Sequence, residues 1–125
     1  MLGRTQQLMA IRREDGVIIS DNVICAFSFF QRLQGLIGLS HLPEQSALWL
    51  KPGGSIHTCG MRFPIDAVFL DSNLRILAIS QNIHPWRWRL APRHTHSTLE
   101  LASDRNSRLR LRRGDELFIR HNQGG

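Results

Sequence analysis

The sequence predicts a small, mainly β (β-rich α+β) fold, with a single antiparallel, barrel-like or rolled sheet and one or two short helices. The apolar runs are short and are separated by turn residues, as in chains built from many strands. No internal repeat or Gly/Ser linker divides the chain, and 42% of its 125 residues are hydrophobic, which is enough to form a core. We therefore expect residues 1–125 to form one domain.

The first half of the chain is expected to begin with an N-terminal hairpin within residues 1–20. Its Asp15-Gly16 dipeptide is typical of the tight turn that joins two hairpin arms. Ser28 can cap a helix that extends to about Leu36, because apolar residues recur after it at helical spacing. In order, the expected elements are hairpin arms over 7–11 and 17–19, a strand over 22–27, the helix over 28–36 and a strand over 47–50.

The second half is expected to contain mostly short strands. Pro64 separates the first two, and Asp71-Ser72-Asn73 is typical of a turn before the third. Ser103 or Asp104 can cap a short helical turn. In order, we expect strands over 55–61, 65–70 and 74–79, an irregular segment over 82–92, a strand over 98–101, the helical turn and a last strand over 116–119.

The composition limits the classes of function. The net charge is +6, with 15 Arg and a single Lys, which allows an anionic partner without establishing one. No apolar run reaches the roughly 18 to 20 residues of a membrane span, and the N-terminus lacks the layout of a secretory signal, so we expect a cytoplasmic protein unless a signal has been removed. Cys25 and Cys59 follow no disulfide or zinc pattern and are expected to be reduced thiols.

His57 and Cys59 stand two positions apart, so on a strand their side chains would share one face. A thiolate nucleophile with an imidazole base is one interpretation, and a metal site with further ligands is another. The third is structural: Cys59 is a small buried residue, and His57 is hydrogen-bonded and partly buried. The further candidate ligands are Cys25, His84, His94 and His96. Motifs for zinc, phosphate loops, dinucleotides and nucleophile elbows are all lacking, so we expect no metal and no cofactor.

Asp66 and Glu100 each stand inside an apolar run, so each is expected to be desolvated. A buried carboxylate needs an arginine or a backbone N–H group as its partner, and Arg32 and Arg62 are the candidate counter-ions. The alternative is an acid–base pair, in which Asp66 and Glu100 act together or with His57.

Two cationic segments favour a binding surface. Trp86 and Trp88 alternate with Arg87 and Arg89, a pattern that can stack on sugars, bases or a partner's side chains, or fold back over the barrel mouth. A second run can bind anions or nucleic acid, or can be a solvated face over two buried leucines. That run contains Arg105, Arg108, Arg110, Arg112 and Arg113.

The order of these segments resembles the domain-of-unknown-function family 192, also called uncharacterised protein family 0127. The matching segments are 32–38, 56–71, 74–79, 99–101 and Gly114-Asp115. The resemblance implies a small barrel-like β fold with short helices, a family-like core over about 20–120 and no established activity. It also marks recurrent polar positions at Arg32, Asp66, Glu100 and Asp115. Ile37 stands where the family usually has Met, and Ala102-Ser103 where a Gly is common.

The sequence therefore predicts a module that binds an unknown small ligand or a protein partner. The predicted site is a group of polar residues and Met61 that converge at a barrel mouth: Arg32, His57, Met61, Asp66, Glu100 and Asp115. A hydrolase-like enzyme that uses His57 with Asp66 or Glu100, or Cys59 as nucleophile, remains an alternative. So does a basic anion-binding or nucleic-acid-binding domain that uses Arg108, Arg110, Arg112 and Arg113 with the two tryptophans.

Overall fold

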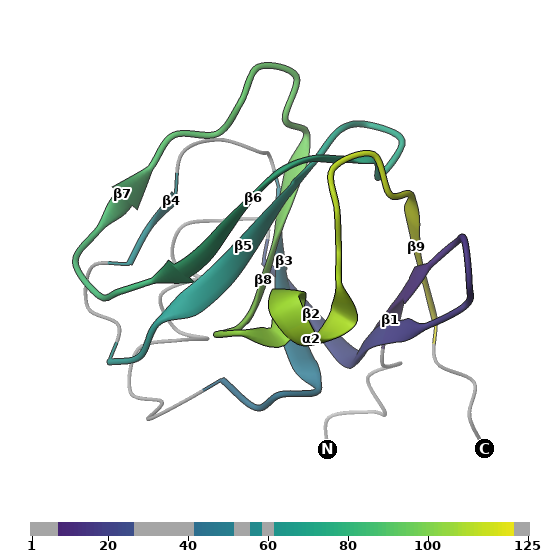
Figure 1. The fold of residues 1–125 in the computed structure, drawn as a ribbon, viewed down its shortest axis with the longest axis horizontal. Coiled ribbons are helices and arrows are strands. Elements are labelled where there is room, and N and C mark those ends of the chain that lie inside the picture. Colours follow the sequence, from purple (N-terminus) through teal and green to yellow (C-terminus); the bar gives the residue numbers. More distant parts are fainter. Residues whose placement is uncertain (1–7, 27–41, 52–55, 59–61, 122–125) are drawn as a thin grey trace.

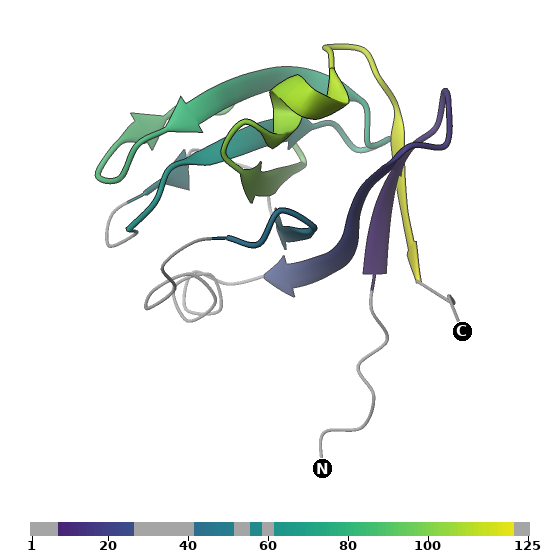
Figure 2. The same cartoon turned by 60° about the horizontal axis from the view of Figure 1, so that its bottom comes forward.

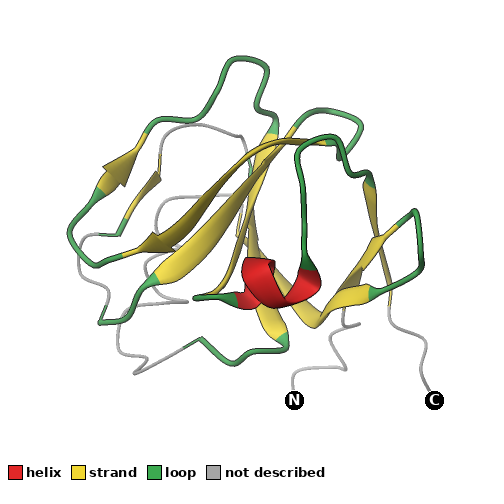
Figure 3. Ribbon diagram, in the orientation of Figure 1, coloured by secondary structure: helices red, strands yellow, loops and turns green. Residues whose placement is uncertain are grey.

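The computed structural model describes residues 8–26, 42–51, 56–58 and 62–121, and most of them belong to strands (Figures 1 and 3). The strands are β1 (Leu8–Arg12), β2 (Ile18–Ala26), β3 (Ser46–Leu50), β4 (Ile56–His57), β5 (Ile65–Leu70), β6 (Ile76–Ile83), β7 (Trp88–Arg89), β8 (Ser97–Ala102) and β9 (Leu117–His121), and the helix α2 is Arg105–Leu109. The predicted mainly β class is confirmed.

Seven of these strands form one sheet in the order β6-β5-β8-β3-β2-β1-β9. The two edge strands, β6 and β9, contact each other at their N-terminal ends. Arg75 forms an isolated bridge with Glu116, and the Ile76 N–H donates to the Asp115 carbonyl at 2.8 Å. The sheet is thus curled into a half-barrel, as the turned view in Figure 2 shows.

The predicted antiparallel pairing needs one correction. β2 and β3 pair in parallel. A parallel pair needs a connection long enough for the chain to return to the end of the sheet where the first strand began, and residues 27–45 separate these two strands. In addition, β4 and β7 form a separate two-stranded antiparallel sheet. Among the described residues, the other strand pairs are antiparallel.

Apolar side chains cover both faces of the middle of the sheet. The inner cluster takes residues from every strand of the half-barrel and from Leu111 after α2, so it fills the concave side. The outer cluster joins β3 and β5 to Ile56 of β4 and Ile83 at the end of β6. All six residues of β5 are buried, which explains its nearly continuous apolar run.

Several predicted boundaries shift. The first two expected strands after the turn are one strand, β2, and β1 pairs with both β2 and β9. The segment over 82–92 is not irregular throughout, because β6 extends to Ile83 and Trp88–Arg89 is β7. The expected helix over 28–36 lies outside the described residues. In the described part of the chain, no helix is long and apolar enough to cross a membrane.

Candidate functional site

Asp66 lies on β5 and points into the concave interior, where it is completely buried. Its Oδ1 accepts the N–H of Asn82 at 2.8 Å, and its Oδ2 accepts the N–H of Asn106 at 2.9 Å. Asn106 is in the first turn of α2, whose own cap residue, Asp104, has a φ of 69° and makes no side-chain cap. The expected side-chain cap by Ser103 or Asp104 is therefore wrong. Instead, Asp66 on β5 accepts one of the backbone N–H groups in the first turn of α2 that have no partner within the helix.

The partners of Asp66 in the described part of the chain are backbone N–H groups. The expected counter-ion Arg62 is exposed, and Arg32 lies outside the described residues. Two backbone N–H donors stabilise a buried carboxylate without a cation, because both oxygens keep hydrogen bonds in place of water. Asp66 thus fixes the position of α2 on the sheet.

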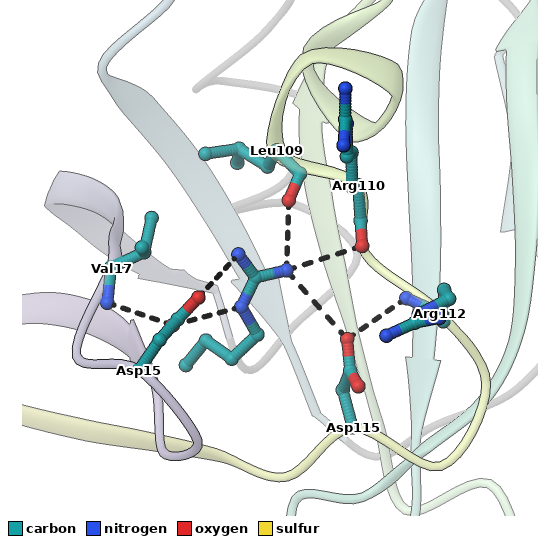
Figure 4. A network of polar contacts seen from close by, with 7 residues as sticks. Asp15, Val17, Leu109, Arg110, Arg112 and Asp115 are labelled. Carbon is teal, nitrogen blue, oxygen red and sulfur yellow. Dashed lines mark hydrogen bonds and ion pairs between the residues drawn. The ribbon is translucent and has the colours of Figure 1, made fainter.

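Arg12 binds the other end of α2, and Figure 4 shows its partners. Its Nη1 donates to the carbonyls of Leu109 at 2.8 Å and Arg110 at 3.2 Å. Its Nε and Nη2 donate to the two carboxylate oxygens of Asp15, both at 3.0 Å. The Asp15 hydrogen bond raises the pKa of Arg12, and the same bond lowers the pKa of Asp15.

Asp115 joins this network. Its Oδ2 lies 3.8 Å from Nη1 of Arg12 and accepts the N–H of Arg112 at 3.0 Å. Gly114 beside it has a φ of 94°, which a glycine adopts without strain, so the Gly-Asp pair forms the turn before β9. Asp115 therefore lies at a structural turn with Arg12, a residue that the sequence analysis did not single out.

Glu100 is also completely buried, but on the other face of the sheet. In the register of β5 and β8, Glu100 stands opposite Ala67, whereas Asp66 stands opposite Leu101. Cross-strand partners share a face, and neighbours along a strand alternate between faces. Ala67 belongs to the outer cluster and Leu101 to the inner one. Asp66 and Glu100 therefore do not face each other as an acid–base pair.

The remaining residues of the predicted polar site are only partly described. The backbone of His57 lies in β4, opposite Trp88 of β7. Arg32 and Met61 lie outside the described residues, as does Cys59. Their convergence with Glu100 and His57 stays a prediction, whereas Asp66 and Asp115 serve the two ends of α2.

The β4–β7 pair carries side chains that are more exposed than Asp66 and Glu100, and Thr58 fixes the backbone that leads into β7. This threonine is completely buried. Its Oγ1 donates to the His84 carbonyl at 2.6 Å and accepts the Arg87 N–H at 2.9 Å. Its backbone N–H donates to the Arg87 carbonyl at 3.0 Å, and its carbonyl accepts the Trp86 N–H at 3.1 Å. With a longer bond from Oγ1 to the Arg87 carbonyl, at 3.5 Å, this one residue makes five hydrogen bonds to the segment 84–87.

We call residues 84–90 the tryptophan hairpin. Trp86 is 67% exposed, Trp88 is 63% exposed and Leu90 is 81% exposed, although all three are large and apolar. Arg87 and Arg89 alternate with them, and Arg93 follows. The chain has no Asp or Glu between Asp71 and Glu100. The tryptophan hairpin is therefore apolar and cationic together, and the predicted contact loop is exposed rather than folded over the core.

The second cationic run does not extend this surface. Figure 1 shows β7 at the left of the molecule and the loop before β9 to the right of its centre. Arg108 pairs with Glu44, and the Arg110 carbonyl accepts a hydrogen bond from Arg12. Arg112 and Arg113 line an open groove of about 590 Å³ with Arg13 and with the acidic residues Glu14, Asp115 and Glu116. Whether this run binds an anion together with the two tryptophans therefore stays a prediction.

The described residues bear on the metal and thiol hypotheses only in part, because Cys59 lies outside them. Within it, no three His, Cys, Asp or Glu side chains are grouped closely enough to hold a metal ion. Cys25 is a free, half-buried thiol, and burial raises its pKa. A raised pKa lowers the thiolate fraction at neutral pH, which makes Cys25 a poor nucleophile.

Comparisons with known proteins agree with this fold. No functionally curated protein matches the chain. A protein of unknown function from Novosphingobium aromaticivorans has a TM-score of 0.75 and 17% identity over 89% of this chain and 82% of that one. A putative transcription regulator from Sinorhizobium meliloti has a TM-score of 0.72 and 22% identity over 90% and 91%. Identities this low show a shared fold alone. The model of domain-of-unknown-function family 192, described as an uncharacterized ACR, matches residues 10–119, so the chain belongs to that family.

Proposed function

We propose that this protein is a binding module that contacts an anionic partner through the tryptophan hairpin. The observation that carries the proposal is the exposure of Trp86, Trp88 and Leu90 on a segment held by the buried Thr58. Large apolar side chains grouped on a surface mark interaction sites, and Trp and Arg are the residues that contribute most at interfaces.

The charge around the hairpin favours an anionic partner. Arg87 and Arg93 are exposed, and Arg89 is half-buried. The guanidinium of Arg89 donates to the Trp88 carbonyl at 2.7 Å, and this single bond uses one of the five N–H donors of the group. Because no carboxylate occurs between Asp71 and Glu100, nothing within this stretch of sequence neutralises these cations.

The positions of the candidate catalytic groups also favour binding over hydrolysis. Asp66 uses both of its oxygens to hold Asn82 and Asn106, and Glu100 lies on the opposite face of the sheet. The Sinorhizobium protein is described as a putative transcription regulator. A nucleic acid is accordingly one of the anionic partners that the experiment includes.

The test is a titration in which the fluorescence emission of the three tryptophans is recorded. The probes are a single-stranded oligonucleotide, vesicles that contain phosphatidylglycerol, and polyglutamate. We expect at least one probe to shift the emission saturably, and its affinity to fall between about 50 and about 200 mM salt. Arg87→Gln with Arg89→Gln should weaken binding roughly tenfold, because two charge-assisted contacts are lost.

The matched control is Arg112→Gln with Arg113→Gln, which removes the same charge from the groove beside β9, away from β7. If the control weakens binding as much as the hairpin variant, net charge explains the effect and the proposal is wrong. The proposal also fails if none of the three probes binds.

A further inference from the structure

We infer that the anionic partner of the tryptophan hairpin is a lipid surface, into whose headgroup region Trp86, Trp88 and Leu90 insert. This inference rests on the proposed function, since it names the partner of the same site. It depends on three properties of the hairpin: the kind of apolar side chains, the position of the arginines and the rigidity of the backbone.

The exposure of Leu90 favours a lipid surface over a nucleic acid as the partner. It is the most exposed of the three side chains, at 81%. Bases stack on flat aromatic or guanidinium faces, and a leucine has none, so Leu90 adds nothing to a contact with single-stranded nucleic acid. At a bilayer, the same side chain enters the acyl boundary while the amphipathic rings of Trp86 and Trp88 lie at the headgroups.

The arginines supply the second attraction that a small apolar contact needs. Lipid attachment through one weak element is marginal and reversible, and a second, electrostatic element makes it stable. Arg87, Arg89 and Arg93 lie beside the apolar side chains, and long cationic side chains reach the headgroup phosphates while their stems stay apolar. Each such cation near an anionic membrane strengthens binding by about fivefold.

The backbone presents these side chains without a large ordering cost. The five hydrogen bonds of Thr58 hold the segment 84–87, and Ile56 on β4 and Ile83 before His84 are both buried in the outer cluster. Figure 1 shows the β4–β7 pair at the periphery of the molecule, where a flat surface can approach it. A preorganised contact loses less entropy on binding, so a small insertion is sufficient.

The experiment uses sedimentation of the full chain with vesicles of phosphatidylglycerol and phosphatidylcholine in equal parts, or of phosphatidylcholine alone. We expect binding to the first and at least tenfold weaker binding to the second. Leu90→Ser should weaken binding to the anionic vesicles by about tenfold, because its apolar side chain no longer inserts. Ile24→Thr is the matched control, because Ile24 is also exposed but lies on β2 in the main sheet. It should bind like the unchanged chain.

Insertion has its own measurement. In a variant with Trp49→Phe and Trp88→Phe, Trp86 is the only tryptophan, and lipids labelled with a quencher at known depths should quench it most strongly from shallow positions. Unchanged binding of Leu90→Ser, or the absence of quenching at any depth, contradicts the inference. Binding to the oligonucleotide or to polyglutamate but not to vesicles overturns it and leaves the proposed function standing. Binding to no probe overturns both.

Discussion

The helix α2 and the tryptophan hairpin use charged side chains in opposite ways. At α2, the carboxylate of Asp66 and the guanidinium of Arg12 are buried and bind backbone groups of the helix. At the hairpin, Arg87 is exposed and Arg89 is half-buried, beside exposed tryptophans. A helix of five residues has too few internal hydrogen bonds to be stable alone, so it depends on partners in distant strands. At the hairpin, we propose that the arginines contact an external partner.

Substitution of Asp66 should have the largest effect on stability. Asp66→Ala leaves the N–H groups of Asn82 and Asn106 without their acceptors in the interior, and we expect a loss of about 2–4 kcal/mol in the free energy of unfolding. Urea denaturation measures it. Asp21→Ala removes an exposed carboxylate from β2 and should change the stability by less than about 0.5 kcal/mol. Equal effects of the two substitutions would contradict a structural role for Asp66.

Substitution of Arg12 should have the next largest effect. Arg12→Ala frees the carbonyls of Leu109 and Arg110 and leaves Asp15 without its partner, so we expect a loss of about 2–3 kcal/mol. The neighbouring Arg13 makes a surface ion pair with Glu116, at 3.5 Å, and its guanidinium lies 5.5 Å from the centre of the Phe118 ring. Arg13→Ala should therefore cost at most about 1 kcal/mol. If the two variants unfold at the same urea concentration, the network in Figure 4 does not stabilise α2.

Thr58 has features of both regions. Its side chain is buried, like those of Asp66 and Arg12, but its hydrogen bonds hold the exposed tryptophan hairpin. Thr58→Val keeps the shape and removes the hydroxyl that joins His84 to Arg87, so we expect a loss of about 1–2 kcal/mol. The fluorescence anisotropy of the tryptophans should fall as the hairpin loosens. Thr58→Ser keeps the hydroxyl and should keep the anisotropy. A valine variant with unchanged anisotropy would mean that other contacts hold the hairpin.

These contacts show which parts of the molecule can be read from the sequence. The burial of Asp66 was predictable because it interrupts an apolar strand, but Asn106 is 40 positions away, so no local pattern identifies it as the partner. The opposite faces of Asp66 and Glu100 depend on the register of β5 and β8, which alternation within one strand does not determine. For the tryptophan hairpin, the alternation of Trp and Arg indicated a contact loop, whereas the anchoring by Thr58 needed the structure.

Acid should weaken the Arg12 end of α2. The hydrogen bond from Arg12 holds the pKa of Asp15 below its ordinary value of 3.8. A carboxylate with a lowered pKa in the folded state contributes stability that is complete well above 3.8 and is lost as the pH falls through the lower, folded value. The difference in unfolding free energy between the unchanged chain and Asp15→Asn should therefore be constant near neutral pH and should shrink in acid. A difference that grows in acid has the wrong sign for this ion pair.

The smallest effect on stability is expected at the hairpin itself. Trp86→Ala and Leu90→Ala remove side chains that are mostly in water in the folded state, so little buried area is lost and the unfolding free energy should change by less than about 0.5 kcal/mol. Binding to the anionic partner should fall with the same substitutions, which separates the two roles. A loss of stability near that of Asp66→Ala would instead place these side chains among the structural contacts. Stability retained while binding is lost is the outcome that a surface made for an external partner requires.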